Sequence, residues 1–110
     1  MRVETIEFDF LEEAKIWGRI SHNDDDELIK MLISSAVDYA ELYLNKHLRF
    51  STIYDDNNKI IATQGLKELP QGIKIWIIYY AIANYDGEDI ESIKKRTLWM
   101  LAPFRNGRFL

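Results

Sequence analysis

The sequence predicts an all-α fold: a small bundle of four to five helices, with a long loop or β-hairpin arm between the second and third main helices. Residues 70–85 are almost entirely apolar over a length greater than that of ordinary strands. Residues 24–47 show helical periodicity, because their polar members recur every three or four positions: Glu27, Lys30, Ser34, Asp38, Glu41 and Asn45. At 47% hydrophobic content, the 110 residues are sufficient for the core of one domain spanning residues 1–110.

The first helix is expected over residues 10–17. Asp9 is placed as its N-cap and Glu12 completes a capping box. Gly18 is expected to end the helix, because glycine readily takes the left-handed conformation that terminates helices. Residues 1–8 alternate imperfectly between apolar and polar side chains, which predicts an extended arm.

The second helix follows an acid-rich segment. A calcium-binding loop starting at Asp24 is excluded, because its sixth position is Ile29 instead of glycine and its twelfth is Ser35 instead of glutamate. We therefore interpret Asp24 as an N-cap, with Glu27 completing a capping box. The apolar face of this helix is wider than a lone surface helix needs, which indicates packing on two sides and leaves part of it for another subunit.

Residues 49–69 are the least regular part of the chain. Two strand-like runs, 50–54 and 59–62, flank an Asp- and Asn-rich turn at residues 55–58, which is typical of a β-hairpin. A two-stranded ribbon is marginal in water by itself, so this hairpin needs a surface to lie against. A floppy surface loop is the alternative. If it is a hairpin, we expect an interaction arm carried by its apolar residues: Phe50, Ile53, Tyr54, Ile60 and Ile61.

The third helix is expected to begin at Pro70 and to end before Gly87. Its apolar composition predicts the buried centre of the bundle, where each large side chain contributes about 1.5 to 3 kcal/mol. The last helix opens with residues 88–92 and is broken by Pro103. Its inner face consists of Ile93, Thr97, Leu98 and Leu101.

Residues 103–110 form the expected C-terminal tail. It combines aromatic and guanidinium groups, which are enriched at interface hot spots. We therefore expect the tail to dock on a neighbouring subunit or partner; a frayed terminus is the alternative. The candidate interface residues are Phe104, Arg105, Arg108 and Phe109.

Composition excludes several function classes. The formal charge of −4 disfavours a protein that binds nucleic acid through clustered cations, and residues 94–96, the one cationic run, suit the C-terminal half of a helix. The chain has no cysteine, and its two histidines are expected more than about 30 Å apart along a helix, so no metal site is predicted. Scattered glycines form no phosphate loop, and no serine lies in a nucleophile elbow, so neither an enzyme nor a cofactor is expected.

The longest uncharged apolar run, residues 75–83, is far shorter than the roughly 20 residues of a membrane span, and no secretory signal is expected.

Four short phrases occur in a characteristic order. Residues 15–20 are similar to a Lys-x-x-Leu-Arg-Ile motif. The third helix is preceded by Leu69-Pro70 and ends in Tyr85-Asp86. Residues 100–105, Met-Leu-Ala-Pro-Phe-Arg, are similar to Leu-Leu-x-Pro-Tyr-Arg. The pattern Asp-x-x-Leu-x-x-Leu-Ile-x-x-Ala-x-x-Tyr is matched by Asp25, Leu28, Met31, Leu32, Ile33, Ala36 and Tyr39. Over residues 15–105 the chain therefore resembles the small head–tail connector proteins of long-tailed bacteriophages.

Three departures from that family pattern are visible. Relatives often carry Tyr-Glu-Asn-Arg after the third helix, where this chain has Tyr-Asp-Gly-Glu at residues 85–88. Gly18 replaces a larger residue in the first phrase, and residues 49–69 match nothing in detail.

The resemblance implies a structural virion protein, assembled in the bacterial host cytoplasm, without cofactor or membrane. It implies a ring of about a dozen copies that joins the portal of the head to the tail-side head-closure protein. The ring would extend the DNA channel, and an acidic subunit suits such a conduit because it does not hold a passing polyanion. A small helical DNA-binding or regulatory domain is the alternative, and a small helical enzyme is a third class.

Overall fold

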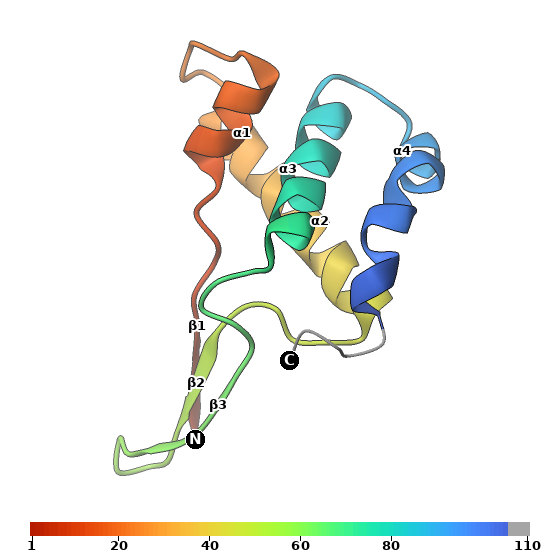
Figure 1. Cartoon of the computed structure of the whole chain (residues 1–110). Helices are drawn as coiled ribbons and strands as arrows, with labels where there is room; N and C mark the ends of the chain where they lie inside the picture. The colour runs from red at the N-terminus through yellow and green to blue at the C-terminus, as the bar shows by residue number, and fades with distance from the viewer. Residues whose placement is uncertain (106–110) are drawn as a thin grey trace.

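The structure is a computed structural model that describes residues 1–105, and in this part of the chain a helical body carries a three-stranded antiparallel sheet (Figure 1). The expected all-α class is therefore wrong: the fold is mixed α/β, although mostly helical. In chain order the elements are β1 (Arg2–Thr5), α1 (Leu11–Gly18), α2 (Asp26–Leu44), β2 (Ser51–Tyr54), β3 (Ile60–Gln64), α3 (Gln71–Tyr85), α4 (Ile90–Thr97) and two short 3-10 turns, η1 (Leu98–Met100) and η2 (Ala102–Phe104).

The sheet forms because the N-terminal segment pairs with the hairpin. Strand β1 is antiparallel to β2, with Val3 opposite Ile53, and β2 is antiparallel to β3, with Ile53 opposite Ala62. The hairpin expected from the sequence is confirmed, and β1 is the surface that it needed to lie against. The all-α prediction missed this pairing because it joins segments far apart in the chain, whereas sequence periodicity reports only local structure.

The turn between β2 and β3 is held by one side chain. The Asp55 carboxylate accepts the backbone N–H of Asn57 at 2.8 Å and of Lys59 at 3.0 Å, while Asn58 is left-handed with φ 62°. These Asp and Asn roles are those expected of an Asx-rich turn. In β3, Ile60 lies opposite Tyr54 and Ile61 is the extra residue of a β-bulge.

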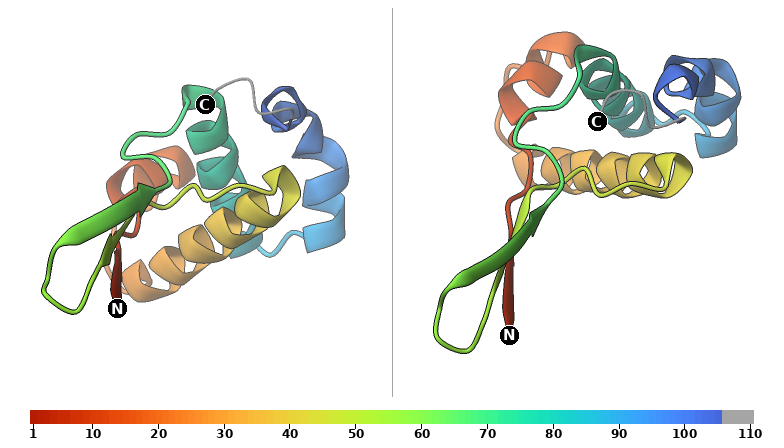
Figure 2. Two further views of the ribbon diagram at one scale, coloured as in Figure 1. Left: turned by 90° about the horizontal axis from the view of Figure 1, so that it is seen from below. Right: turned by 60° about the horizontal axis from the view of Figure 1, so that its bottom comes forward.

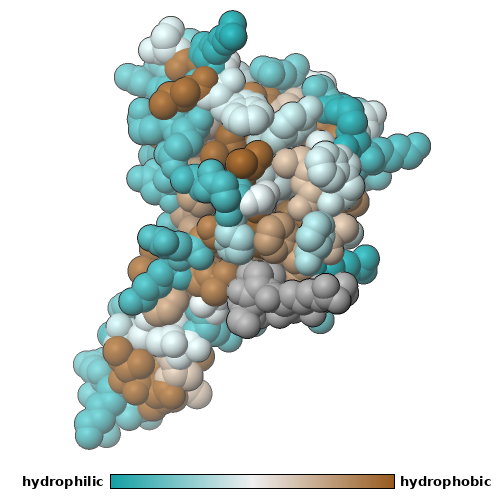
Figure 3. Space-filling view, in the orientation of Figure 1, coloured by the Kyte–Doolittle hydropathy of each residue, from teal (hydrophilic) through white to brown (hydrophobic). Residues whose placement is uncertain are grey.

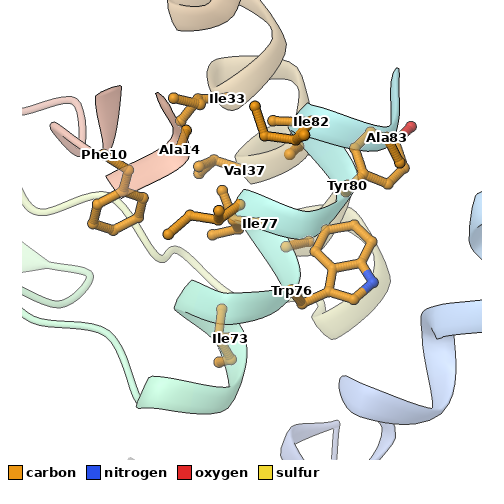
Figure 4. Close-up of a cluster of buried hydrophobic side chains, with 14 of the residues drawn as sticks. Phe10, Ala14, Ile33, Val37, Ile73, Trp76, Ile77, Tyr80, Ile82 and Ala83 are labelled. Carbon is orange, nitrogen blue, oxygen red and sulfur yellow. The ribbon is translucent and has the colours of Figure 1, made fainter. Parts of the chain in front are cut away.

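Helix α3 is the centre of the body, as predicted. It lies against α2 with α1 and α4 at its sides (Figures 1 and 2). Trp76 and Ile77 of α3 are fully buried, and Ile33 and Val37 of α2 pack in the same cluster (Figure 4). The predicted inner face of the last helix is confirmed by the burial of Ile93, Thr97 and Leu101 and the partial burial of Leu98.

Both expected capping boxes are wrong. Helix α1 begins after Phe10 without a side-chain cap from Asp9. Helix α2 begins after Asp25, one residue beyond the expected N-cap Asp24, and no side chain caps it there. The acids at the start of α2 instead bind other elements: Asp26 pairs with the buried Lys15 ammonium at 2.8 Å, and Asp25 accepts a hydrogen bond from the Tyr85 hydroxyl. Tertiary partners thus outcompete the local cap.

The end of α1 also differs from the expectation. Arg19, at φ 55°, takes the left-handed position that we assigned to Gly18. Glycine at position 18 has a different role, because a Cβ there would lie 3.2 Å from the Ile82 side chain. Gly18 therefore permits the close approach of α1 to α3.

Two glycines give a matched test of backbone geometry. Both have positive φ, but a Cβ on Gly65 would lie 1.9 Å from the Arg49 carbonyl oxygen, whereas a Cβ on Gly87 would meet nothing within 4 Å. We expect Gly87→Ala to lower the free energy of unfolding by about 1 to 2 kcal/mol. Gly65→Ala should lower it by about 2 to 5 kcal/mol, because overpacking adds to the strain. Urea unfolding of both variants measures the difference, and equal losses would contradict the close approach at Gly65.

Candidate interaction surfaces

The sheet projects from the helical body as an arm (Figures 1 and 2). We use "the arm" for strands β1, β2 and β3 and the turn at residues 55–59. The radius of gyration is 15.3 Å, compared with roughly 13 Å for a compact domain of this length. The arm therefore extends beyond the compact helical body and adds exposed surface to it.

Apolar side chains are exposed on the arm (Figure 3). Ile60 is 62% and Ile61 54% exposed on β3, and Val3 on β1, the opposite edge strand, is 56% exposed. Ile53 and Tyr54, on the central strand, are half-buried. The structure thus brings four of the five predicted arm residues together on one small sheet.

The fifth residue, Phe50, lies at the base of the arm. It lines an apolar groove of about 440 Å³ together with Ile6, Phe8, Phe10, Leu66 and Lys67. The Phe8 and Phe10 rings stack with centroids 5.3 Å apart, and the Lys67 ammonium lies 5.1 Å from the Phe50 ring. Glu7 and Asp9 also line the groove, but apolar side chains predominate, so it offers mainly shape and apolar contact.

Arg49 connects the arm to α2, and the sequence analysis missed it. Its guanidinium binds Glu41 at 2.6 Å and Asp38 at 2.8 Å, both on α2, and donates to the Ser34 carbonyl at 3.0 Å. It also pairs with Glu7, which follows β1. One side chain therefore ties both the N-terminal segment and the start of β2 to the helical body.

The electrostatics of this cluster keep Arg49 charged. Burial acts to lower the pKa of Arg49, but hydrogen bonds to Glu7 and Asp38 outweigh it and hold the pKa above its ordinary value. The carboxylate of Glu41 also accepts the backbone N–H groups of Leu48 and Arg49 at 2.9 and 3.2 Å. The available signal in the sequence was the spacing of Ser34, Asp38 and Glu41 on one side of α2, which served above only as evidence of helical periodicity.

The predicted tail residues are partly engaged within the subunit. Phe104 packs at the start of α3, where a Cβ on Gly72 would lie 3.0 Å from its ring. The Arg105 guanidinium lies 4.7 Å from the Tyr43 ring centroid on α2. Arg108 and Phe109 lie outside the described residues.

The cationic run of α4 also has partners. Lys94 lies 4.1 Å from the Tyr39 ring centroid. Arg96 pairs with Glu88 at 2.8 Å and donates to the Tyr79 hydroxyl at 3.0 Å, and these two hydrogen bonds raise the pKa of Arg96. The run is therefore largely occupied by contacts within the subunit.

Within residues 1–105, no three His, Asp or Glu side chains gather into a set suited to a metal ion. In the same part of the chain, none of the helices combines the length and the apolar composition of a membrane span.

Comparison with known proteins agrees with the resemblance drawn from the sequence. The model of the phage gp6-like head-tail connector protein family matches residues 8–99. No curated protein and no solved structure gives a significant match. The matched part includes helices α1 to α4, the hairpin and Arg49 with its partners on α2. The chain therefore belongs to the family of phage gp6-like head-tail connector proteins.

Proposed function

We propose that this connector protein is a ring-forming structural adaptor of the virion, which joins the portal of the phage head to the tail-side head-closure protein and extends the DNA channel. The family supports the connector role, and the observation that carries the finer proposal is the projecting arm. About a dozen copies would form the ring in the bacterial host cytoplasm, and no chemistry is assigned to the protein.

The arm is proposed as an interaction element. Strands β1 and β3 are the two edges of the sheet, so each presents backbone N–H and C=O groups that a strand of another chain can pair with. The exposed Ile60 and Ile61 side chains would add apolar contact area next to the β3 edge. Since Arg49 ties the base of the arm to α2, the arm is held in place before a partner arrives, which lowers the entropic cost of binding.

Charge supports passage of DNA without specific binding. The chain is acidic overall, at −4, and several of its cations are paired with acids of the same subunit, including Lys15, Arg49, Lys74 and Arg96. DNA affinity depends on clustered cations that release counterions from phosphates. An acidic subunit with paired cations is suited to line or surround a DNA channel, and it disfavours the alternative of a DNA-binding domain.

The proposal is tested by mixing the protein with purified portal and following assembly by sedimentation. We expect the wild type to co-sediment with the portal as a ring. Ile60→Asp with Ile61→Asp should abolish this, because two charges would lie in the proposed apolar contact. The matched control is Ile16→Asp on α1, a 76% exposed isoleucine outside the arm, which should assemble normally. A wild-type protein that stays monomeric and does not bind the portal would contradict the adaptor function.

A further inference from the structure

Helix α2 has an apolar stripe on the side that faces away from α3. The stripe consists of Leu28, Met31, Ser35, Asp38 and Leu42, which are spaced three or four residues apart and so lie along one side of the helix. Met31 is 67% and Leu42 78% exposed, whereas the residues of the opposite side, such as Ile33, are buried in the core. Scattered single aliphatics are ordinary on a surface, but three aligned on one helix side form a contact strip.

A different surface lies on the opposite side of the body. Trp17 of α1 contacts the Tyr79 ring of α3 edge to face, with centroids 6.1 Å apart, and Tyr79 accepts a hydrogen bond from Arg96 of α4. Trp99 is 70% exposed and donates its indole N–H to the Arg96 carbonyl at 2.9 Å. We name Trp17, Tyr79, Arg96 and Trp99 the aromatic face. These residues come from α1, α3, α4 and η1, and Figure 1 shows α2 behind α3.

The two surfaces are complementary in charge. The α2 stripe includes Asp38 and is flanked by Glu27, whose exposed carboxylate pairs with Lys30 at 3.3 Å. Asp38 shares the single cation Arg49 with Glu7 and Glu41, so the charge beside the stripe remains negative overall. The aromatic face includes Arg96 and is flanked by the exposed Lys95, with Glu88 as the acid that pairs with Arg96. Opposite charges around apolar centres favour association of one surface with the other and disfavour pairing of either surface with itself.

Their placement on the body also fits head-to-tail contact. The shortest extent of the molecule is 20 Å, which is the thickness of two helix layers. Figure 2 shows α2 as one layer and α1, α3 and α4 as the other. Unlike surfaces on opposite sides of a plate generate a heterologous interface, which closes into a ring when the rotation between copies allows it.

We propose that the α2 stripe of one copy docks on the aromatic face of the next copy, and that this contact is the lateral interface of the ring. The inference rests on the ring-forming function proposed above. Met31 and Leu42 meet Trp99 and Trp17 of the neighbour, and the acids beside the stripe meet Lys95 and Arg96. Tryptophan and arginine at the centre of such a contact supply most of the binding energy.

Cysteine cross-linking tests the interface directly, because the native chain has no cysteine and gives no background. Ser35→Cys places a thiol in the α2 stripe. Ser92→Cys places one on an exposed position of α4, one helical turn before Arg96 and so beside the aromatic face. With portal present and a short bismaleimide added, the double variant should give a ladder of covalent oligomers. Either single variant alone should give none, and a mixture of the two single variants should stop at dimers. The matched control pairs Ser35→Cys with Glu12→Cys on α1 and should give no ladder.

The outcomes separate this inference from the adaptor function. If sedimentation shows portal-bound rings but cross-linking gives no ladder of oligomers, the proposed interface is wrong and the adaptor function is retained. Ser35→Cys that cross-links to itself would also overturn it, because it would mean an α2-to-α2 contact of identical surfaces. If the portal is not bound at all, the adaptor function fails, and the ladder is then sought in the free protein at high concentration. Its absence there as well would overturn the interface.

Discussion

Replacing Trp76 with alanine is expected to lower the free energy of unfolding by about 3 to 5 kcal/mol, a large share of the roughly 5 to 15 kcal/mol that stabilises an ordinary domain. Trp76 is fully buried in α3, and its ring packs on those of Tyr80 and Tyr39, with centroids 4.9 and 6.0 Å away. Its indole N–H also donates to the Thr97 hydroxyl at 3.0 Å, which joins α3 to α4. Urea unfolding followed by circular dichroism measures the loss.

Two further variants identify the origin of this effect. Trp99→Ala removes the same side chain from a site that is 70% exposed and should cost less than about 1 kcal/mol. Trp76→Phe retains a large ring but removes the hydrogen bond to Thr97, so an intermediate loss of about 1 to 3 kcal/mol is expected. Similar losses for Trp76→Ala and Trp99→Ala would mean that α3 is not the centre of the core.

Replacing Arg49 with glutamine is expected to free the arm and to lower the free energy of unfolding by about 2 to 3 kcal/mol. Removing one partner of a buried ion pair costs about 3 to 5 kcal/mol, because the remaining charge is left uncompensated. Here the cost is smaller, since the side chains of Glu7 and Asp38 are 61% and 69% exposed and regain water. Glu41 is the one carboxylate of the cluster left mostly buried.

The effect on the arm is measured by hydrogen exchange. In Arg49→Gln the backbone amides of residues 1–8 and 49–69 should exchange faster than in the wild type, whereas those of α3 should change little beyond the global loss of stability. Lys59→Gln is the control, because it removes one cation from the exposed turn of the arm, away from α2. Unchanged exchange in the arm of Arg49→Gln would show that strand pairing alone holds the arm in place.

Several elements of the fold were predictable because their cause is local. An apolar run too long for a strand identified α3, and alternating runs around an Asp- and Asn-rich turn identified the hairpin. The ordered phrases of residues 15–105 identified the family, which the match over residues 8–99 confirms. The arm and tail interfaces proposed from residue types stay predictions until assembly is measured.

Other features depended on contacts between distant segments. Local cap rules assigned Asp9 and Asp24 to helix starts, but neither caps a helix, and Asp25 and Asp26 bind Tyr85 and Lys15 instead. A cap gains roughly 1 kcal/mol, which is similar to or less than the contribution of a charged hydrogen bond to a partly buried partner. Where the two compete, tertiary contacts therefore decide.

The sequence by itself thus determined the family, the buried central helix and the presence of a hairpin, because periodicity and turn chemistry are properties of neighbouring residues. Only the tertiary structure decided that β1 completes the hairpin into a sheet and that Arg49 collects acids from α2 and from the segment after β1. Strand pairing and ion clusters join residues that are distant in the chain, and no local pattern records which distant segment will be the partner. The mixed α/β class and the projecting arm follow from those two non-local contacts.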